Sequence, residues 1–113
     1  MAVFSEYQEP GPSRAEIDGT RGAVVLEFGA NGCGYCRGAA PTIAAALADR
    51  AEVAHIKVAD GPGRPLGRSF RVKLWPTLIL LRDGREAGRV VRPTGEAEVR
   101  TALAAAFDQP DPA

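Results

Sequence analysis

The two cysteines of this chain, Cys33 and Cys36, are separated by only two residues. A disulfide between them would close a very small ring and remove little conformational entropy from the unfolded chain, so it would not hold distant segments together. The 113 residues must therefore fold on a hydrophobic core. This length is typical of one domain, and hydrophobic residues make up 45% of the chain, which is enough for such a core.

Charge and hydropathy exclude several classes of partner. Fourteen Lys and Arg residues balance fourteen Asp and Glu residues, so no net field attracts a phosphate backbone and we expect no nucleic-acid partner. The apolar runs fall far short of the roughly 20 residues that span a bilayer, so we expect no membrane segment. The first residues lack the basic start and the apolar stretch of a secretory signal, which favours a cytoplasmic protein.

Breaker residues and hydrophobic periodicity predict the organisation of the chain. Prolines around Gly11 separate an N-terminal arm (1–12) from one domain (13–108), which a flexible tail (109–113) follows. Apolar runs predict buried strands at 23–28 and 77–82, and β-branched residues predict a central strand at 52–58. Helices are expected after Ser13, at 34–50 with a kink at Pro41, at 66–70, and after Thr94, which we expect to cap the last one.

The order of these elements restricts the topology of the sheet. A strand, helix and strand in succession require a parallel pair with a right-handed crossover. Asp83-Gly84 is a strong hairpin signal and requires an antiparallel return strand at 86–91. The prediction is an α/β fold in which helices cover both faces of a central mixed β-sheet.

The cysteine pair lies between the first buried strand and the start of the helix at 34–50. The first turn of a helix has unpaired N–H groups and the positive end of the helix dipole, which stabilise a thiolate at Cys33. Cys36 then lies one turn further along, within reach of a mixed disulfide formed on Cys33. Because the thiolate is the nucleophile of thiol–disulfide exchange, we expect Cys33 to attack and Cys36 to resolve.

Over residues 23–107 the chain resembles the thioredoxin family. The resemblance rests on Glu27-Phe28-Gly29-Ala30, Cys33-Gly34-Tyr35-Cys36, Pro41, Asp60, Trp75-Pro76-Thr77 and Asp83-Gly84. It implies a thioredoxin fold and a thiol–disulfide oxidoreductase that reduces or exchanges protein disulfides through a mixed disulfide. It also implies a monomer without a cofactor that takes electrons from a reductase or from glutathione.

The resemblance assigns roles to individual residues. It implies a cis peptide bond at Pro76 facing the cysteines, where the backbone of Trp75 pairs with an extended segment of the substrate. Glu27 stands where the family has a buried aspartate beneath the second cysteine. Burial disfavours the charged form of a carboxyl group, so we expect Glu27 to exchange a proton with Cys36, through water. A glutamate exposed at a sheet edge is the alternative.

The chain departs from the family pattern at three places. Gly32 stands where most of the family have a tryptophan, and Trp75 stands where a smaller or β-branched residue is usual. Arg92 stands near the position at which the family has a glycine in its partner-docking surface. We expect Trp75 to cover the space beside the cysteines. Tyr35 is similar to the corresponding residue of glutaredoxins and bacterial disulfide isomerases, but the glutathione signature is missing, which favours a reductase. The predicted substrate-binding residues are Gly34, Tyr35, Trp75, Pro76, Thr77 and Arg92.

Two other readings of the cysteines remain open. A zinc site would need two further ligands, and the chain offers only His55 and carboxylates, so we expect no metal. His55 is more simply a hydrogen-bonded residue of the sheet. The second alternative is a thioredoxin-fold binding or chaperone module, whose cysteines sense redox state without turnover.

Overall fold

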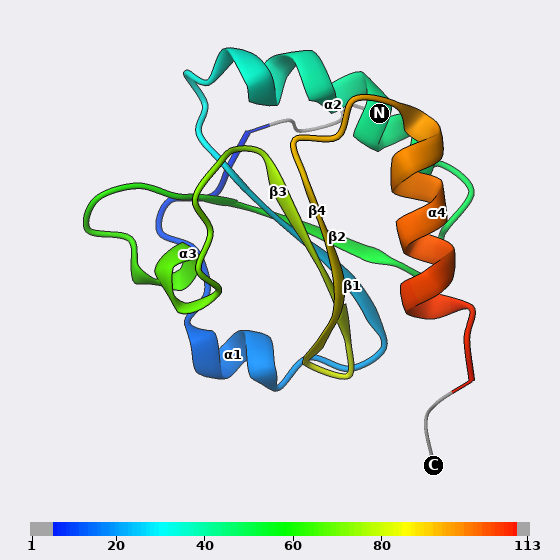
Figure 1. Cartoon of the computed structure of the whole chain (residues 1–113). Helices are drawn as coiled ribbons and strands as arrows, with labels where there is room; N and C mark the ends of the chain where they lie inside the picture. The colour runs from blue at the N-terminus through cyan, green and yellow to red at the C-terminus, as the bar shows by residue number, and fades with distance from the viewer. Residues whose placement is uncertain (1–5, 111–113) are drawn as a thin grey trace.

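The computed structural model describes residues 6–110 and contains the predicted alternation of strands and helices (Figure 1). The thioredoxin fold expected from the resemblance is confirmed. In chain order the elements are α1 (Arg14–Asp18), β1 (Ala23–Gly29), α2 (Gly34–Leu47), β2 (Ala54–Ala59), α3 (Pro65–Ser69), β3 (Thr77–Arg82), β4 (Arg85–Val91) and α4 (Glu96–Phe107).

The four strands form one mixed sheet in the order β2-β1-β3-β4. β1 and β2 are parallel, and the other two pairs are antiparallel, as predicted. The expectation that 52–58 forms a central strand is wrong, because β2 lies at the edge of these four strands. The unbroken apolar runs of β1 and β3 suit the two central places, whereas β2 buries only Val58 and Ala59.

The hairpin between β3 and β4 is the tight turn that its two residues predicted. Asp83 and Gly84 both have positive φ, 51° and 81°, which is the backbone of a turn that matches the twist of the strands. A Cβ atom on Gly84 would lie 2.1 Å from the carbonyl oxygen of Asp18. The second residue of the turn must therefore be glycine.

Helices cover both faces of the sheet, so the two central strands β1 and β3 supply residues to two cores (Figure 1). α2 and α4 lie on one face, where Ile43 and Leu103 pack with Leu78 of β3. α1 and α3 lie on the other, where Ile17 and Phe28 are fully buried. Alternate residues of β1 and β3 thus enter opposite cores, as the period of a strand requires.

The ends of α2 and α4 differ in detail from the prediction. α2 continues through Pro41 and ends at Leu47 rather than near position 50. α4 has Gly95 as its N-cap residue, so Thr94 does not cap it. The N–H of Thr94 instead donates to Glu98 at 3.0 Å, and the carboxylate thereby pairs with the chain that leads into the helix.

The described part of the N-terminal arm packs against the sheet. The N–H of Gln8 donates to the Lys57 carbonyl at 2.9 Å, and Gln8 accepts from the N–H of Ala59 at 3.0 Å. Tyr7 is consequently buried, with 6% of its surface exposed. Residues 1–5 of the arm and 111–113 of the predicted tail lie outside the described part of the chain. Within that part, no helix is both long and apolar enough to cross a membrane.

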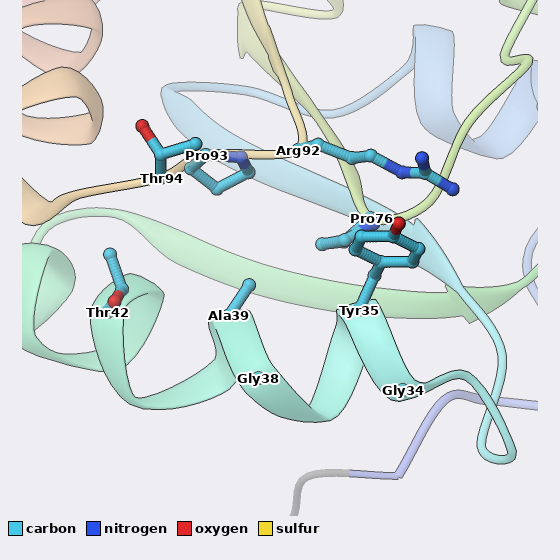
Figure 2. A pocket seen from close by; sticks show the side chains of 9 residues that line it. All are labelled: Gly34, Tyr35, Gly38, Ala39, Thr42, Pro76, Arg92, Pro93 and Thr94. Carbon is cyan, nitrogen blue, oxygen red and sulfur yellow. The ribbon is translucent and has the colours of Figure 1, made fainter.

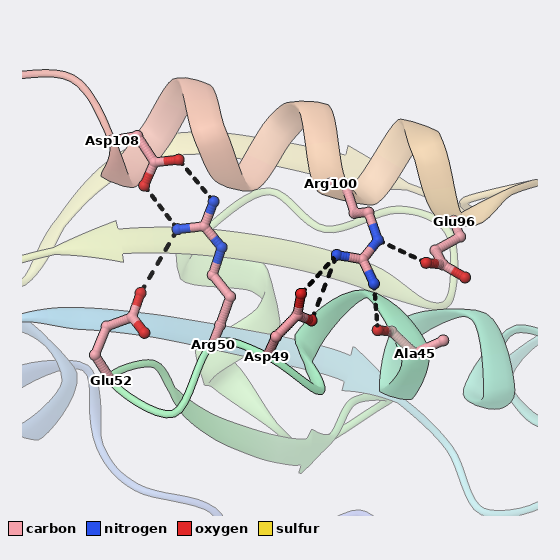
Figure 3. A network of polar contacts seen from close by, with 7 residues as sticks. All are labelled: Ala45, Asp49, Arg50, Glu52, Glu96, Arg100 and Asp108. Carbon is pink, nitrogen blue, oxygen red and sulfur yellow. Dashed lines mark hydrogen bonds and ion pairs between the residues drawn. The ribbon is translucent and has the colours of Figure 1, made fainter.

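Two arginines connect the end of α2 to α4 (Figure 3). Arg50 donates to both oxygens of Asp108 at 2.7 Å. Arg100 donates to Glu96 at 2.6 Å and to Asp49 at 3.4 Å. The hydrogen bonds to these arginines lower the pKa of Asp49 and of Asp108 below their ordinary values.

Replacing Asp108 by asparagine should make the protein less stable at neutral pH but not in acid. A lowered pKa stabilises the fold above the unfolded-state pKa of about 3.9, and this contribution is lost as the pH falls through the folded-state value. Because the pair is exposed, we expect a decrease in melting temperature of a few degrees at most, which disappears towards pH 2. Thermal unfolding followed by circular dichroism at several pH values measures this. An equal decrease at every pH would contradict the prediction.

Candidate active site

The two thiols occupy different environments at the start of α2. Cys33 is the N-cap residue, with extended backbone, and its Sγ accepts a hydrogen bond from the N–H of Cys36 at 3.2 Å. Both cysteines are free thiols, Cys33 partly exposed and Cys36 only 2% exposed. The sulfur of Cys33 therefore lies at the helix N-terminus and within reach of solvent, whereas that of Cys36 lies beneath it.

Burial raises the pKa of the Cys36 thiol above its ordinary value, and the hydrogen bond with Cys33 acts in the same direction. A hydrogen bond with the backbone of Ala30 and one with the side chain of Tyr7 oppose this increase. Cys36 thus carries its proton at neutral pH. It needs a proton acceptor before its sulfur becomes a nucleophile.

A buried carboxylate contacts Tyr7, which belongs to the same buried cluster as this thiol. Glu27 is 1% exposed, so the alternative of an exposed glutamate at the edge of the sheet is wrong. The hydroxyl of Tyr7 donates to Glu27 Oε2, and His55 Nε2 lies 2.8 Å from Oε1. The expectation that His55 is a hydrogen-bonded residue of the sheet is confirmed.

Trp75 lies beside the cysteines rather than in either of the two main cores. Its indole N–H donates to Asp60 at 2.9 Å. Trp75 and Cys33 pack against the same buried cluster, which contains Tyr7 and Cys36. The peptide bond between Trp75 and Pro76 is cis, as expected.

A groove of about 710 Å³ runs from the start of α2 to the loop that follows β4 (Figure 2). Tyr35 is 65% exposed at one end of it, and the Arg92 guanidinium lies 3.9 Å above the Tyr35 ring. The same guanidinium donates through Nε to the Trp75 carbonyl at 2.8 Å. The residues that line the groove are Gly34, Tyr35, Gly38, Ala39, Thr42, Pro76, Arg92, Pro93 and Thr94.

Thr77 does not belong to this groove as a contact residue. It is 1% exposed, and its hydroxyl donates to the Leu74 carbonyl at 2.6 Å. The expectation that Thr77 binds the substrate is therefore wrong for its side chain. Thr77 holds the segment that leads to Pro76 instead.

Reasoning from the sequence missed Tyr7, which it placed in an arm outside the domain. One signal for a close neighbour was present in the sequence, namely the glycine at position 29, at the end of a buried strand. The structure shows why this residue has no side chain: a Cβ atom on Gly29 would lie 2.6 Å from the Tyr7 hydroxyl and 2.8 Å from the Cys36 sulfur. Among residues 6–110 no three His, Cys, Asp or Glu side chains are grouped so that they could hold a metal ion.

An exposed thiol above a buried one, at the start of a helix in an α/β fold, defines the class of dithiol redox proteins. The family model described as thioredoxin matches residues 13–105. The chain is 34% identical over 95 residues to a thioredoxin of Mycolicibacterium smegmatis, covering 81% of this chain and 85% of that protein. It belongs to the thioredoxin family.

Two further comparisons agree with this membership. Thioredoxin 2 from Pseudomonas aeruginosa PAO1, solved in its reduced form, superposes with a TM-score of 0.81 at 49% identity, covering 88% of this chain and 93% of that one. A protein disulfide-isomerase A2 of Pongo abelii is 41% identical over 66 residues, which are 55% of this chain and 13% of that protein. The protein is a thiol–disulfide oxidoreductase.

Proposed function

We propose that the protein reduces or exchanges disulfides of other proteins through Cys33 and Cys36. One observation carries the proposal: the partly exposed sulfur of Cys33 accepts the N–H of Cys36 at the start of α2, while the Cys36 thiol is buried beneath it. The unpaired N–H groups of the first turn of α2 can stabilise negative charge that develops on the Cys33 sulfur during the exchange. The buried thiol is then protected from solvent but close to any bond formed on Cys33.

The reaction proceeds in two exchanges. The Cys33 thiolate attacks one sulfur of the substrate disulfide, which forms a mixed disulfide and releases the other substrate sulfur as a thiolate. Cys36 then loses its proton and attacks Cys33, so the bond to the substrate breaks and a disulfide forms within the protein. The substrate gains two electrons, which the two cysteines lose.

Glu27 is the proposed acceptor of the proton that Cys36 loses. It is the buried carboxylate of this region, and the hydroxyl of Tyr7 connects it to the cluster that contains Cys36. The transfer gives a nucleophilic thiolate without requiring hydroxide from bulk water.

The groove of Figure 2 is the proposed binding site for an extended segment of the substrate. Gly34, Tyr35 and Pro76 provide a surface without charge, and Arg92 provides the cationic group at its edge. The Trp75 carbonyl already accepts a hydrogen bond from Arg92. A substrate backbone that pairs with this carbonyl must therefore displace the Arg92 side chain or share the acceptor with it.

A reductase or glutathione is the proposed donor that restores the dithiol, so that the protein carries electrons from it to protein disulfides. We propose that it acts as a cytoplasmic monomer without a cofactor. The absence of a cysteine other than the reacting pair agrees with a reducing compartment, where structural disulfides are rare.

Limited alkylation tests the assignment of roles. With less than one equivalent of iodoacetamide, the reduced protein should be modified first at Cys33, because only this thiol reaches solvent at the helix start. Peptide mass spectrometry identifies the modified residue, and the rate of insulin reduction should fall in proportion to the modification of Cys33. Faster modification of Cys36 would reverse the two roles.

Trp75, the only tryptophan, should report the redox state of the pair. It packs on the same cluster as Cys33, and a nearby disulfide quenches indole emission, so the emission should increase on reduction. Trp75→Ile should keep the fold but lower kcat/KM toward protein disulfides by up to about tenfold, because an aromatic wall of the site is lost.

The control for the emission measurement is Cys33→Ser, which cannot form the disulfide and should show no change on reduction. The contrary result has two parts: the emission of the unchanged protein is the same in both redox states, and the Trp75→Ile variant is strongly destabilised. Together they would indicate a core tryptophan without contact to the site.

A further inference from the structure

The hydroxyl of Tyr7 lies between the two groups that must exchange a proton. It donates to Glu27 Oε2 in the buried interior. The space above the Cα atom of Gly29 is shared by this hydroxyl and the Cys36 sulfur, since a Cβ atom there would lie 2.6 Å from one and 2.8 Å from the other. Tyr7 and Cys36 belong to one buried cluster.

The geometry points to Tyr7 as a proton relay between Cys36 and Glu27 in the second exchange. This inference rests on the proposed function, in which Cys36 resolves the mixed disulfide and Glu27 accepts its proton. It replaces the water molecule expected between these two side chains by a phenol that the chain itself supplies. The Tyr7 hydroxyl and the reacting Cys36 sulfur border the same space above Gly29, so this inference gives Tyr7 a direct part in the proton transfer.

The backbone around Tyr7 keeps the hydroxyl in place. The N–H of Tyr7 donates to the side chain of Asn31 at 2.9 Å, and the next residue, Gln8, is hydrogen-bonded to Lys57 at 2.9 Å. The ammonium of Lys57 lies 4.4 Å from the centre of the Tyr7 ring. Contacts with Asn31 and Lys57 thus hold the phenol in place, which a relay requires because proton transfer depends on hydrogen-bond distances.

The protons balance without a tyrosinate intermediate. Cys36 S–H gives its proton to Tyr7 Oη while Tyr7 gives its own proton to Glu27 Oε2. The Cys36 sulfur bonds to Cys33, and the bond between Cys33 and the substrate breaks with release of a thiolate. Burial and the neighbouring Glu27 raise the pKa of Tyr7 far above its ordinary value, so the phenol remains neutral throughout and both protons must move together.

A path from Glu27 to solvent completes the relay. His55 Nε2 lies 2.8 Å from the other carboxylate oxygen, and the His55 side chain is 31% exposed. Glu27 can therefore return its proton to water through the His55 side chain, which lies on the edge strand β2, before the next cycle. The ionisable groups that face the relay from its neighbouring elements are Glu6, Glu27, Cys33, Arg37, His55 and Lys57.

Single-turnover reaction with the aromatic disulfide DTNB separates the two exchanges. Attack by Cys33 releases the first thionitrobenzoate, and attack by Cys36 on the mixed disulfide releases the second. Tyr7→Phe keeps the ring and removes only the hydroxyl. We expect it to leave the first phase unchanged and to slow the second phase by about tenfold to a hundredfold near pH 7.

The pH profile distinguishes a relay from a structural role. Without the hydroxyl, Cys36 must lose its proton to solvent, so the second phase of Tyr7→Phe should accelerate by about tenfold per pH unit and approach the rate of the unchanged protein in alkali. Three results for Tyr7→Phe would each overturn the inference. They are a slowing of both phases by the same factor, a second phase as fast as in the unchanged protein, and a second phase with the same pH dependence as in the unchanged protein.

A double-variant cycle with Glu27→Gln tests whether the two groups act in series. In a relay, adding Tyr7→Phe to Glu27→Gln should slow the second phase by no more than about twofold further. If the double variant is instead slowed by the product of the two single-variant factors, Glu27 accepts the proton by a route that bypasses Tyr7. If the unchanged protein releases no second equivalent at all, the proposed function fails, and this result is distinct from a failure of the relay.

Discussion

Cys33→Ser should abolish the reduction of insulin, with a loss of at least about 10³-fold, because a serine hydroxyl does not ionise to a nucleophile at neutral pH. Cys36→Ser should lose turnover as well but retain the first exchange. It should accumulate as a mixed disulfide with the substrate, because no second thiol attacks the bond on Cys33. Non-reducing electrophoresis and mass spectrometry show the trapped complex.

Cys33→Ser is the matched control for trapping, since it retains the buried thiol and lacks the exposed one. It should form no complex with the same substrate. Complexes formed by Cys33→Ser but not by Cys36→Ser would contradict the assigned order of attack.

Phe28→Ala should give the largest loss of stability, about 3–5 kcal/mol. Phe28 is fully buried in β1, with its ring centre 6.0 Å from that of Phe70, so truncation removes apolar contacts and leaves a cavity between the sheet and α3. A domain is stable by only about 5–15 kcal/mol, so this variant loses a large part of its total. Urea unfolding should show a lower midpoint with an unchanged slope.

Val91→Thr provides the control for this measurement. Val91 is 43% exposed in β4, and the substitution keeps a β-branched side chain, so the change in stability should stay within about 0.5 kcal/mol. Similar losses for both variants would show that β1 is not the centre of the core.

Local rules were sufficient for several elements of the fold. The apolar runs of β1 and β3 predicted buried strands, and the Asp83-Gly84 pair predicted the turn between β3 and β4 because its backbone must have positive φ. The same holds for the cysteines: their position after a buried strand and before a helix predicted Cys33 at the start of that helix, with Cys36 one turn further along. Each of these inferences depends on residues that are close in sequence.

The sequence by itself thus determined the elements, the mixed sheet and the position of the dithiol. Only the tertiary structure decided what surrounds that dithiol. It placed the Tyr7 hydroxyl against Glu27 in the buried cluster of Cys36, Arg92 over Tyr35, and the hydroxyl of Thr77 inward. The physical reason is that these contacts join residues far apart in the chain, so they depend on strand order and on packing, which no local periodicity encodes.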